Sequence, residues 1–306
     1  MLSPPDVLVL GGGGVLGEAW MTGVLAGIED ATGFDLRRCE SFVGTSAGSI
    51  LAAHLVAGNA PGRPPATTTA EIDAPTSQPA GALQAALLGA VRHAGAWALG
   101  AGSPFASLAL GITSPGGAVM RAAVLRRLPP PRDTLDDLRE HVERSGARFD
   151  GRLRVVAVDR HSGRRIVFGR PGAPDATVGE AVQASCAVPW LFAPVRIEGR
   201  EYVDGGVWSP TNLDTAPAGR DTHVLCLNPA VSITGSHTLR EVARDLARSA
   251  ASLESLVLRR RGAAVRLVAP SMESAAAMGS DFMSREPRVR VLAAGYRQGV
   301  ALATER

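Results

Sequence analysis

The feature that most constrains the fold is an alternation of short apolar runs and helical patterns near the start of the chain. Residues 7–10 form an apolar, partly β-branched run that stops at four glycines, which is typical of a buried parallel strand. A helical pattern follows over 15–31, a second short strand is expected at 41–44, and a second helix at 49–57. This order of elements predicts an α/β fold with a parallel sheet.

The later part of the chain continues this mixture of strands and helices. We expect hairpins at 153–168 and 195–206, apolar strands within 222–229 and 263–270, and a closing helix at 288–304. No repeat or composition break divides the 306 residues. The sequence therefore predicts one domain over 1–306, with a mainly parallel sheet between two helical layers, a three-layer α/β/α architecture.

Two helices carry more specific signals. Thr177 followed three residues later by Glu180 predicts a capping box at the start of a helix that runs to Ala187. A long amphipathic helix is predicted from an apolar stripe, which is expected to face the core; its members are Leu239, Val242, Leu246, Ala250, Leu253 and Val257.

Two adjacent stretches interrupt the pattern. Residues 58–82 are rich in Pro, Thr, Ala and Gly, which is typical of a flexible surface insertion. Residues 83–120 are apolar and contain two Ser-Pro breaks, so they do not read as a membrane-spanning helix. For this second stretch two interpretations stay open: a buried helical pair, or a lid over an apolar site.

The stretch Gly44-Thr45-Ser46-Ala47-Gly48 lies between the second predicted strand and the second predicted helix. A serine held on a tight strand-to-helix turn, between small residues, is the arrangement of a hydrolase nucleophile. The helix that follows points its free amides toward the place where an oxyanion would form. A chance small-residue turn is the alternative.

The glycine run that follows the first strand has two interpretations. Gly12, Gly14 and Gly17 match the spacing of a dinucleotide-binding turn, but the second strand lacks the acidic residue that would bind the ribose. Consecutive glycines also let several backbone amides converge on one oxygen, as an oxyanion hole requires.

Asp204 ends a predicted strand and is followed by Gly205 and Gly206. Taken alone, this pattern is typical of a turn at a hairpin exit. Together, the glycine run, the serine turn and the Asp-Gly-Gly sequence make this chain resemble the patatin-like phospholipase family, whose motifs occur in this order. The segment 181–216, with Pro189 and Pro194, also resembles the family's stretch around its aspartate.

The resemblance implies a catalytic dyad of Ser46 and Asp204, without a histidine, and hydrolysis of carboxylic esters of phospholipids, lysophospholipids or related lipids through an acyl-enzyme. It also implies an oxyanion hole, and the backbone amides that would form it are those of Gly12, Gly13, Gly14 and Ala47. The remaining motif glycines are Gly17, Gly44, Gly48, Gly205 and Gly206. Leu16 stands where the family often has Arg or Lys, so a cationic contact to an anionic headgroup is missing.

Other functions remain open on the sequence. A Ser-His-Asp esterase would need a histidine after Asp204, which leaves His223 or His237. An acyltransferase would use the same acyl-serine, and a catalytically inactive lipid-binding protein would retain the fold.

Composition narrows the expected partners. A net charge of +3 is too small to indicate nucleic acid. The three cysteines form no CxxC pair, so we expect reduced thiols and no metal site. The resemblance implies no cofactor. The expected partner is a lipid ester, reached through peripheral membrane contact. With no classical signal peptide at the start, we expect a cytoplasmic protein.

Overall fold

The computed structural model describes residues 2–65, 117–127, 129, 131–232, 238–279 and 281–305, with no side chains for 232 and 238–246. The expected insertion at 58–82 lies outside these residues beyond position 65. The apolar stretch at 83–120 lies outside them up to position 116, so neither interpretation of it is tested.

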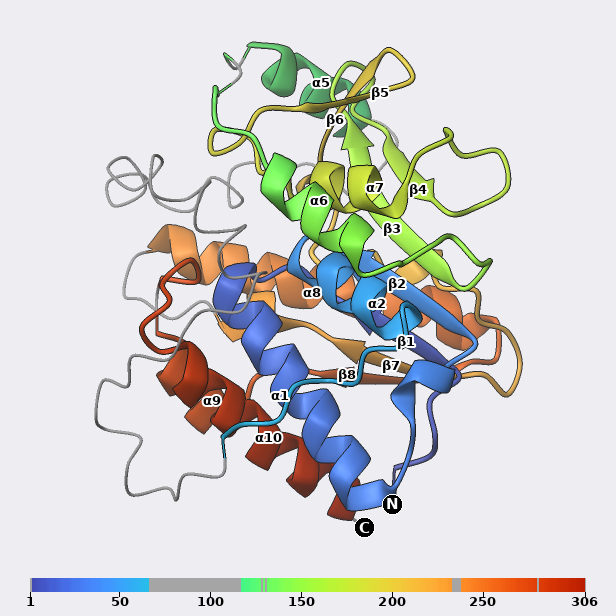
Figure 1. Cartoon of the computed structure of the whole chain (residues 1–306), viewed down its shortest axis with the longest axis vertical. Helices are drawn as coiled ribbons and strands as arrows, with labels where there is room; N and C mark the ends of the chain where they lie inside the picture. The colour runs from blue at the N-terminus through green and yellow to red at the C-terminus, as the bar shows by residue number, and fades with distance from the viewer. Residues whose placement is uncertain are drawn as a thin grey trace.

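A single mixed sheet organises the described chain (Figure 1). Its order is β5-β6-β3-β2-β1-β7-β8, with β4 paired to β3. The pairs β3–β2, β2–β1, β1–β7 and β7–β8 are parallel, and β4, β5 and β6 add antiparallel pairs at one side. The strands are β1 (Val7–Leu10), β2 (Ser41–Thr45), β3 (Leu153–Asp159), β4 (Arg165–Phe168), β5 (Val195–Ile197), β6 (Arg200–Asp204), β7 (His223–Leu227) and β8 (Ala264–Val268).

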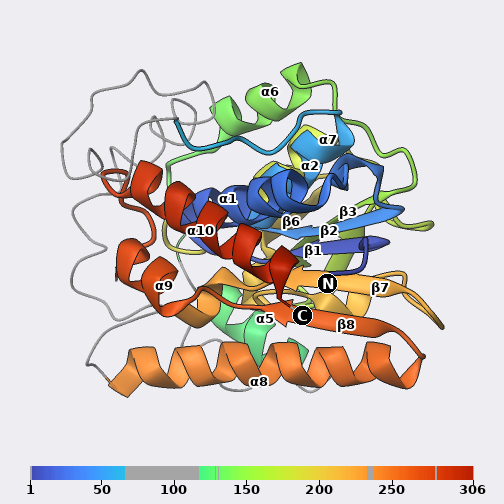
Figure 2. The same cartoon turned by 90° about the horizontal axis from the view of Figure 1, so that it is seen from below.

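Helices cover both faces of this sheet, which confirms the predicted three-layer α/β/α fold. Figure 2 shows one long helix beneath the sheet and several helices above it. The long helix is α8 (Thr238–Arg260); the opposite layer includes α1 (Gly14–Thr32), α2 (Ala47–Val56), α6 (Asp136–Arg144), α7 (Val178–Cys186) and α10 (Arg288–Thr304). The other α-helices of the described chain are α5 (Gly117–Arg127) and α9 (Met272–Met278).

The apolar core follows the alternation of side chains along the strands. Leu8, Leu10 and Phe42 pack with the helices of the upper layer. Their neighbours Val7, Val9 and Val43, on the opposite face, pack in a second cluster that includes Leu258 of α8. Burial on both faces explains why β1 is apolar throughout rather than alternating.

The closing helix holds α1 in place through glycines. A Cβ on Gly27 would lie 2.2 Å from the carbonyl oxygen of Tyr296, and one on Gly299 would lie 2.2 Å from that of Val24. The two helix backbones therefore touch. Because α1 begins at the glycine run, this contact also fixes that run.

Two local features predicted in the later chain are confirmed, the capping box at Thr177 and the hairpin within 195–206. Thr177 Oγ1 accepts the amide of Glu180, and the Glu180 carboxylate accepts the amide of Thr177, at 3.1 and 2.8 Å. The β5–β6 hairpin turns at Glu198 and Gly199, both with positive φ, as its right-handed strand twist requires.

Where the side chains of α8 are described, the predicted inward face is wrong. Leu253 and Val257, expected in the core, are 55% and 39% exposed, whereas Ala251, Glu254 and Leu258 face the sheet. After residue 246, the buried face of α8 consists of Ala247, Ala251, Glu254, Ser255 and Leu258, so Leu253 and Val257 lie on its outer side. The buried carboxylate has specific partners, described below.

Candidate active site

Ser46 occupies a strained turn between β2 and α2. The strand ends at Thr45 and the helix begins at Ala47, leaving Ser46 as the N-cap with φ 50° and ψ −124°. A non-glycine residue in such a region costs about 1–3 kcal/mol and persists only where its surroundings impose it. Ser46 is also half-buried, while Thr45 and Ala47 are buried, so the turn presents the serine outward.

The two glycines around Ser46 are required by close backbone contacts. A Cβ on Gly44 would lie 2.4 Å from Cα of Ser49, and one on Gly48 would lie 2.0 Å from the carbonyl oxygen of Leu10. No side chain fits at either position. The spacing of the motif therefore reflects the packing of α2 across the ends of β1 and β2.

The glycine run lies beside this turn. A Cβ on Gly12 would be 3.4 Å from Cβ of Ser46, because β1 and β2 are parallel neighbours and the two turns leave the same edge of the sheet. A Cβ on Gly13 would overlap the ring of Pro229 at 2.6 Å. The run therefore needs glycine at Gly13 because of the segment after β7, and Gly12 lies within contact distance of Ser46.

The amides of the run differ in what they bind. The Gly12 N–H donates to the carbonyl of Pro210 at 2.8 Å and the Leu16 N–H to that of Phe282 at 3.1 Å. Gly13, Gly14 and Ala47 are N-cap or first residues of α1 and α2, where a helix offers no acceptor. Their amides donate to no other described residue. These three are the donors available to an oxyanion.

Asp204 ends β6 and is almost fully buried, at 1% exposed. Its Oδ1 accepts the Gly206 amide at 2.6 Å. Burial raises the pKa of Asp204 to about 7, while the Gly206 amide and the Ser46 hydroxyl favour the charged form and lower it. The Ser46 hydroxyl is thus near the carboxyl, yet Oδ2 accepts no well-formed hydrogen bond from a described residue.

The C-terminal end of α7 joins the serine turn to Asp204. Ser185 Oγ accepts the Ser46 amide at 2.9 Å and donates to the carbonyl of Val156 at 2.6 Å. Two residues later, the Ala187 carbonyl accepts the Asp204 amide at 3.0 Å. Cys186, between them, faces Ser46 and Ser49, and burial raises the pKa of its thiol, which keeps it uncharged.

Asn212 makes a second link that sequence reasoning missed. Its side-chain amide donates to Thr45 Oγ1 at 3.1 Å and to the Gly205 carbonyl at 3.3 Å. Those acceptors belong to the residues beside Ser46 and Asp204. The Asn212 Oδ1 atom accepts from Arg165 at 3.2 Å. The signal available in the sequence was an asparagine eight residues after the aspartate, in a segment already set apart by its resemblance.

Glu254 anchors the same loop from α8 and was also missed. Its Oε2 accepts the Thr211 hydroxyl at 2.7 Å and the Leu213 amide at 2.8 Å. Burial raises the pKa of Glu254, and the charge of Asp214 raises it further. In the sequence, this contact is indicated only by an acidic residue that shares one face of the α8 helix with Ala247, Ala251 and Leu258.

His223 lies at the opposite end of the parallel strands from Ser46. His223 begins β7 and lies beside Asp6, just before β1. Ser46 comes two residues after Gly44, which pairs with Leu10 at the end of β1. Asp6 and Leu10 are four residues apart along the strand, a distance of about 13 Å. His223 is 3.6 Å from the Asp6 carboxylate, and His237 lies outside the described residues. This placement disfavours the Ser-His-Asp alternative for His223.

The described residues also bear on metal binding and on membrane spanning. They contain no group of three His, Cys, Asp or Glu side chains placed to hold a metal ion. None of their helices combines the length and the apolar character needed to cross a bilayer.

Comparison with known proteins gives a family match and likenesses to solved structures, among them the two described here. Residues 8–217, more than half of the chain, match the family model described as "Patatin-like phospholipase". The crystal structure of VipD from Legionella pneumophila is 15% identical, with a TM-score of 0.44, over 98% of this chain and 67% of that one. The crystal structure of the type III effector protein ExoU is 17% identical, with a TM-score of 0.39, over 97% and 52%. This chain spans about half the length of the latter.

Proposed function

Since this chain belongs to the patatin-like phospholipase family, we propose that it is a serine lipid acyl hydrolase with Ser46 as nucleophile and Asp204 as general base. Its substrates are carboxylic esters of phospholipids, lysophospholipids or related lipids. The observation that carries the proposal is the meeting of an outward, strained serine with a buried carboxyl whose pKa is raised to about 7.

The reaction follows from this arrangement. Asp204 accepts the proton of Ser46 as the serine oxygen attacks the ester carbonyl. The developing oxyanion binds the amides of Gly13, Gly14 and Ala47, and one such donor contributes about 3 kcal/mol to the transition state. Asp204 then protonates the leaving alcohol, and the same carboxylate activates the water that hydrolyses the acyl-serine.

A base with a pKa near the working pH suits this role. An ordinary aspartate, with a pKa of 3.8, is too weak a base to take a serine proton efficiently. Burial raises that pKa because the charged form is poorly solvated. The carboxylate Oδ2, which no described residue hydrogen-bonds, is the atom free to accept the proton.

Leu16 bears on the choice of lipid headgroup. Leu16 is buried in α1 and apolar, so it offers no charge to a phosphate. We therefore expect ester hydrolysis without strict dependence on an anionic headgroup.

A lipid panel tests the proposal. Purified wild type, Ser46→Ala and Asp204→Asn are incubated with diacyl phospholipids, lysophospholipids and neutral acylglycerols, and released fatty acid is quantified. We expect wild type to release fatty acid and both variants to lose at least about 10³-fold of the rate, as removal of one member of a cooperating pair does. Ser252→Ala, the same substitution at an exposed position of α8 away from the turn, is the matched control.

The panel also separates the alternatives. Transfer of the acyl group to an added alcohol in preference to water would identify an acyltransferase that uses the same serine. Binding of the lipids without acyl transfer or hydrolysis would overturn the proposal in favour of a lipid-binding protein.

A further inference from the structure

A pocket lies at the edge of the sheet opposite Ser46. It has a volume of about 360 Å³. Its walls come from the start of β3, the turn after β4, the 3₁₀ turn Leu213–Thr215, the loop before β7 and the turn after α8. All of these lie at the amino-terminal edge of the parallel strands, whereas Ser46 follows the carboxyl end of β2.

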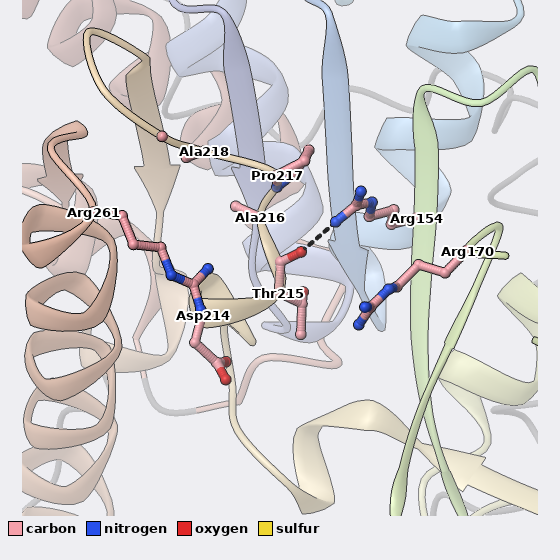
Figure 3. A pocket seen from close by; sticks show the side chains of 9 residues that line it. Arg154, Arg170, Asp214, Thr215, Ala216, Pro217, Ala218 and Arg261 are labelled. Carbon is pink, nitrogen blue, oxygen red and sulfur yellow. Dashed lines mark hydrogen bonds between the residues drawn. The ribbon is translucent and has the colours of Figure 1, made fainter. Parts of the chain in front are cut away.

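Three arginines line this pocket. Figure 3 shows Arg154 from β3 and Arg170 from the turn after β4 reaching toward Thr215, with Arg261 on the other side. Arg154 donates to the carbonyl of Thr215 at 2.6 Å, a neutral acceptor. Neither Arg170 nor Arg261 forms an ion pair with a described residue, so three guanidinium groups share the pocket without a carboxylate of their own.

The one acidic residue of the pocket is already neutralised. Both oxygens of Asp214 accept hydrogen bonds from Arg165, each at 2.6 Å. A two-pronged pair of this kind satisfies the carboxylate. The surplus positive charge in the pocket is therefore not balanced by Asp214.

The arginines also affect one another. Burial lowers the pKa of Arg154, and the charge of Arg170 lowers it further. Two guanidinium groups close enough to interact in this way repel each other, and a bound anion would relieve that repulsion.

We propose that this pocket binds a phosphate monoester group, carried either by a small soluble molecule or by a lipid headgroup. Guanidinium groups match phosphate oxygens in pairs. A phosphate monoester has close to two negative charges at neutral pH and three acceptor oxygens, which suits three arginines better than a single carboxylate would. The volume is at the lower end of ligand pockets and fits a ligand of a few heavy atoms beyond the phosphate.

The site is separate from the proposed hydrolase chemistry. Neither Ser46 nor Asp204 lines the pocket, so a ligand bound there does not occupy the dyad. Loss of ester hydrolysis and loss of phosphate binding are therefore distinct results.

The first test is calorimetric titration of the full chain with glycerol 3-phosphate at fixed ionic strength, with glycerol as the uncharged control. Arg170→Gln and Arg261→Gln are made singly and together, because both residues are exposed and their loss leaves the fold intact. The matched control is Arg290→Gln. Arg290 is exposed on α10, on the other side of the sheet from α8. We expect saturable binding that each pocket substitution weakens about tenfold and Arg290→Gln does not change.

A second arm distinguishes the source of the phosphate. Ser46→Ala protein is floated with phosphatidylcholine vesicles that contain or lack phosphatidic acid, so that hydrolysis does not alter the membrane. Binding that needs phosphatidic acid and both pocket arginines identifies a headgroup site, and binding in the calorimeter alone identifies a soluble ester. Absence of binding in both arms, or binding that survives in the double variant, would overturn the proposal.

Discussion

The carboxyl of Asp204 sets the expected pH dependence of activity. Only the ionised form can accept the Ser46 proton, and burial raises the pKa of this group to about 7. We therefore predict that kcat/KM for a soluble short-chain ester rises about tenfold per pH unit below 7 and levels off above it. A profile that is flat from pH 5 to 8 would mean that Asp204 is not the base.

Asn212 acts on the dyad as a positioning residue. Its amide ties the residue before Ser46 to the residue after Asp204. Asn212→Asp keeps the acceptor that Arg165 uses but removes both donors. We predict a fall of about tenfold or more in kcat with little change in KM, since misplacement of reacting groups affects the chemical step.

The thermal midpoint of the same variant serves as the control for folding. An unchanged kcat in Asn212→Asp protein that melts like wild type would remove Asn212 from the account of the site. Asn59→Asp, at an exposed position, reports the effect of the same chemical change elsewhere.

The packing of α2 on the sheet leads to a prediction about Gly48. A Cβ there would lie 2.0 Å from the Leu10 carbonyl oxygen, and the strand backbone cannot yield. We expect Gly48→Ala to lower the free energy of unfolding by about 3 kcal/mol or more, measured by denaturant titration. Gly219→Ala, where a Cβ meets nothing within 4 Å, should be nearly neutral; equal effects of the two substitutions would contradict this view of the turn.

The elements that the sequence predicted correctly are those specified by local signals. β1 is a run of four apolar residues, α7 has its capping box, and the β5–β6 turn has Gly199, which accepts its positive φ. The outer face of α8 was assigned inward because periodicity shows that a helix has two sides, not which side meets the sheet. α6 and α9, both short, have no counterpart in the expectations from sequence.

The contacts that assemble the candidate site are of another kind. Asn212 and Thr45 are 167 positions apart, and Ser46 and Ser185 are 139 apart. No local pattern links such residues, so Asn212, Ser185 and Glu254 could not be assigned from the sequence. Ser46 and Asp204 could be proposed because each sits in a short glycine motif.

For the molecule as a whole, the buried carboxyl of Glu254 links stability to pH. Its pKa is 4.5 when exposed and is raised by burial in the folded protein. From pH 4.5 upward toward neutrality, the folded protein keeps a proton that the unfolded chain has lost. Its contribution to stability is therefore fully present below pH 4.5 and is lost as the pH rises through the folded pKa.

Other buried groups titrate in the same range, so a matched variant is needed. The pKa values of His54 and His141 are lowered by burial, and their contribution to stability rises with pH up to about 6.5, with the opposite sign. Glu254→Gln removes one titration and can keep the acceptor for Thr211. We predict that the stability of wild type relative to Glu254→Gln falls between pH 4.5 and 7.5 by on the order of 1 kcal/mol per pH unit while Glu254 titrates. A pH-independent difference would show that Glu254 is not buried as described.

The most direct measurement of the central claim is labelling with a fluorophosphonate probe, which reacts with an activated serine. The labelled peptide is identified by mass spectrometry in wild type, Ser46→Ala and Asp204→Asn. The account predicts modification of Ser46 in wild type, none in Ser46→Ala, and strongly slowed labelling in Asp204→Asn. Failure of the folded wild type to react, or labelling of Ser46 at the same rate without the Asp204 carboxylate, would contradict it.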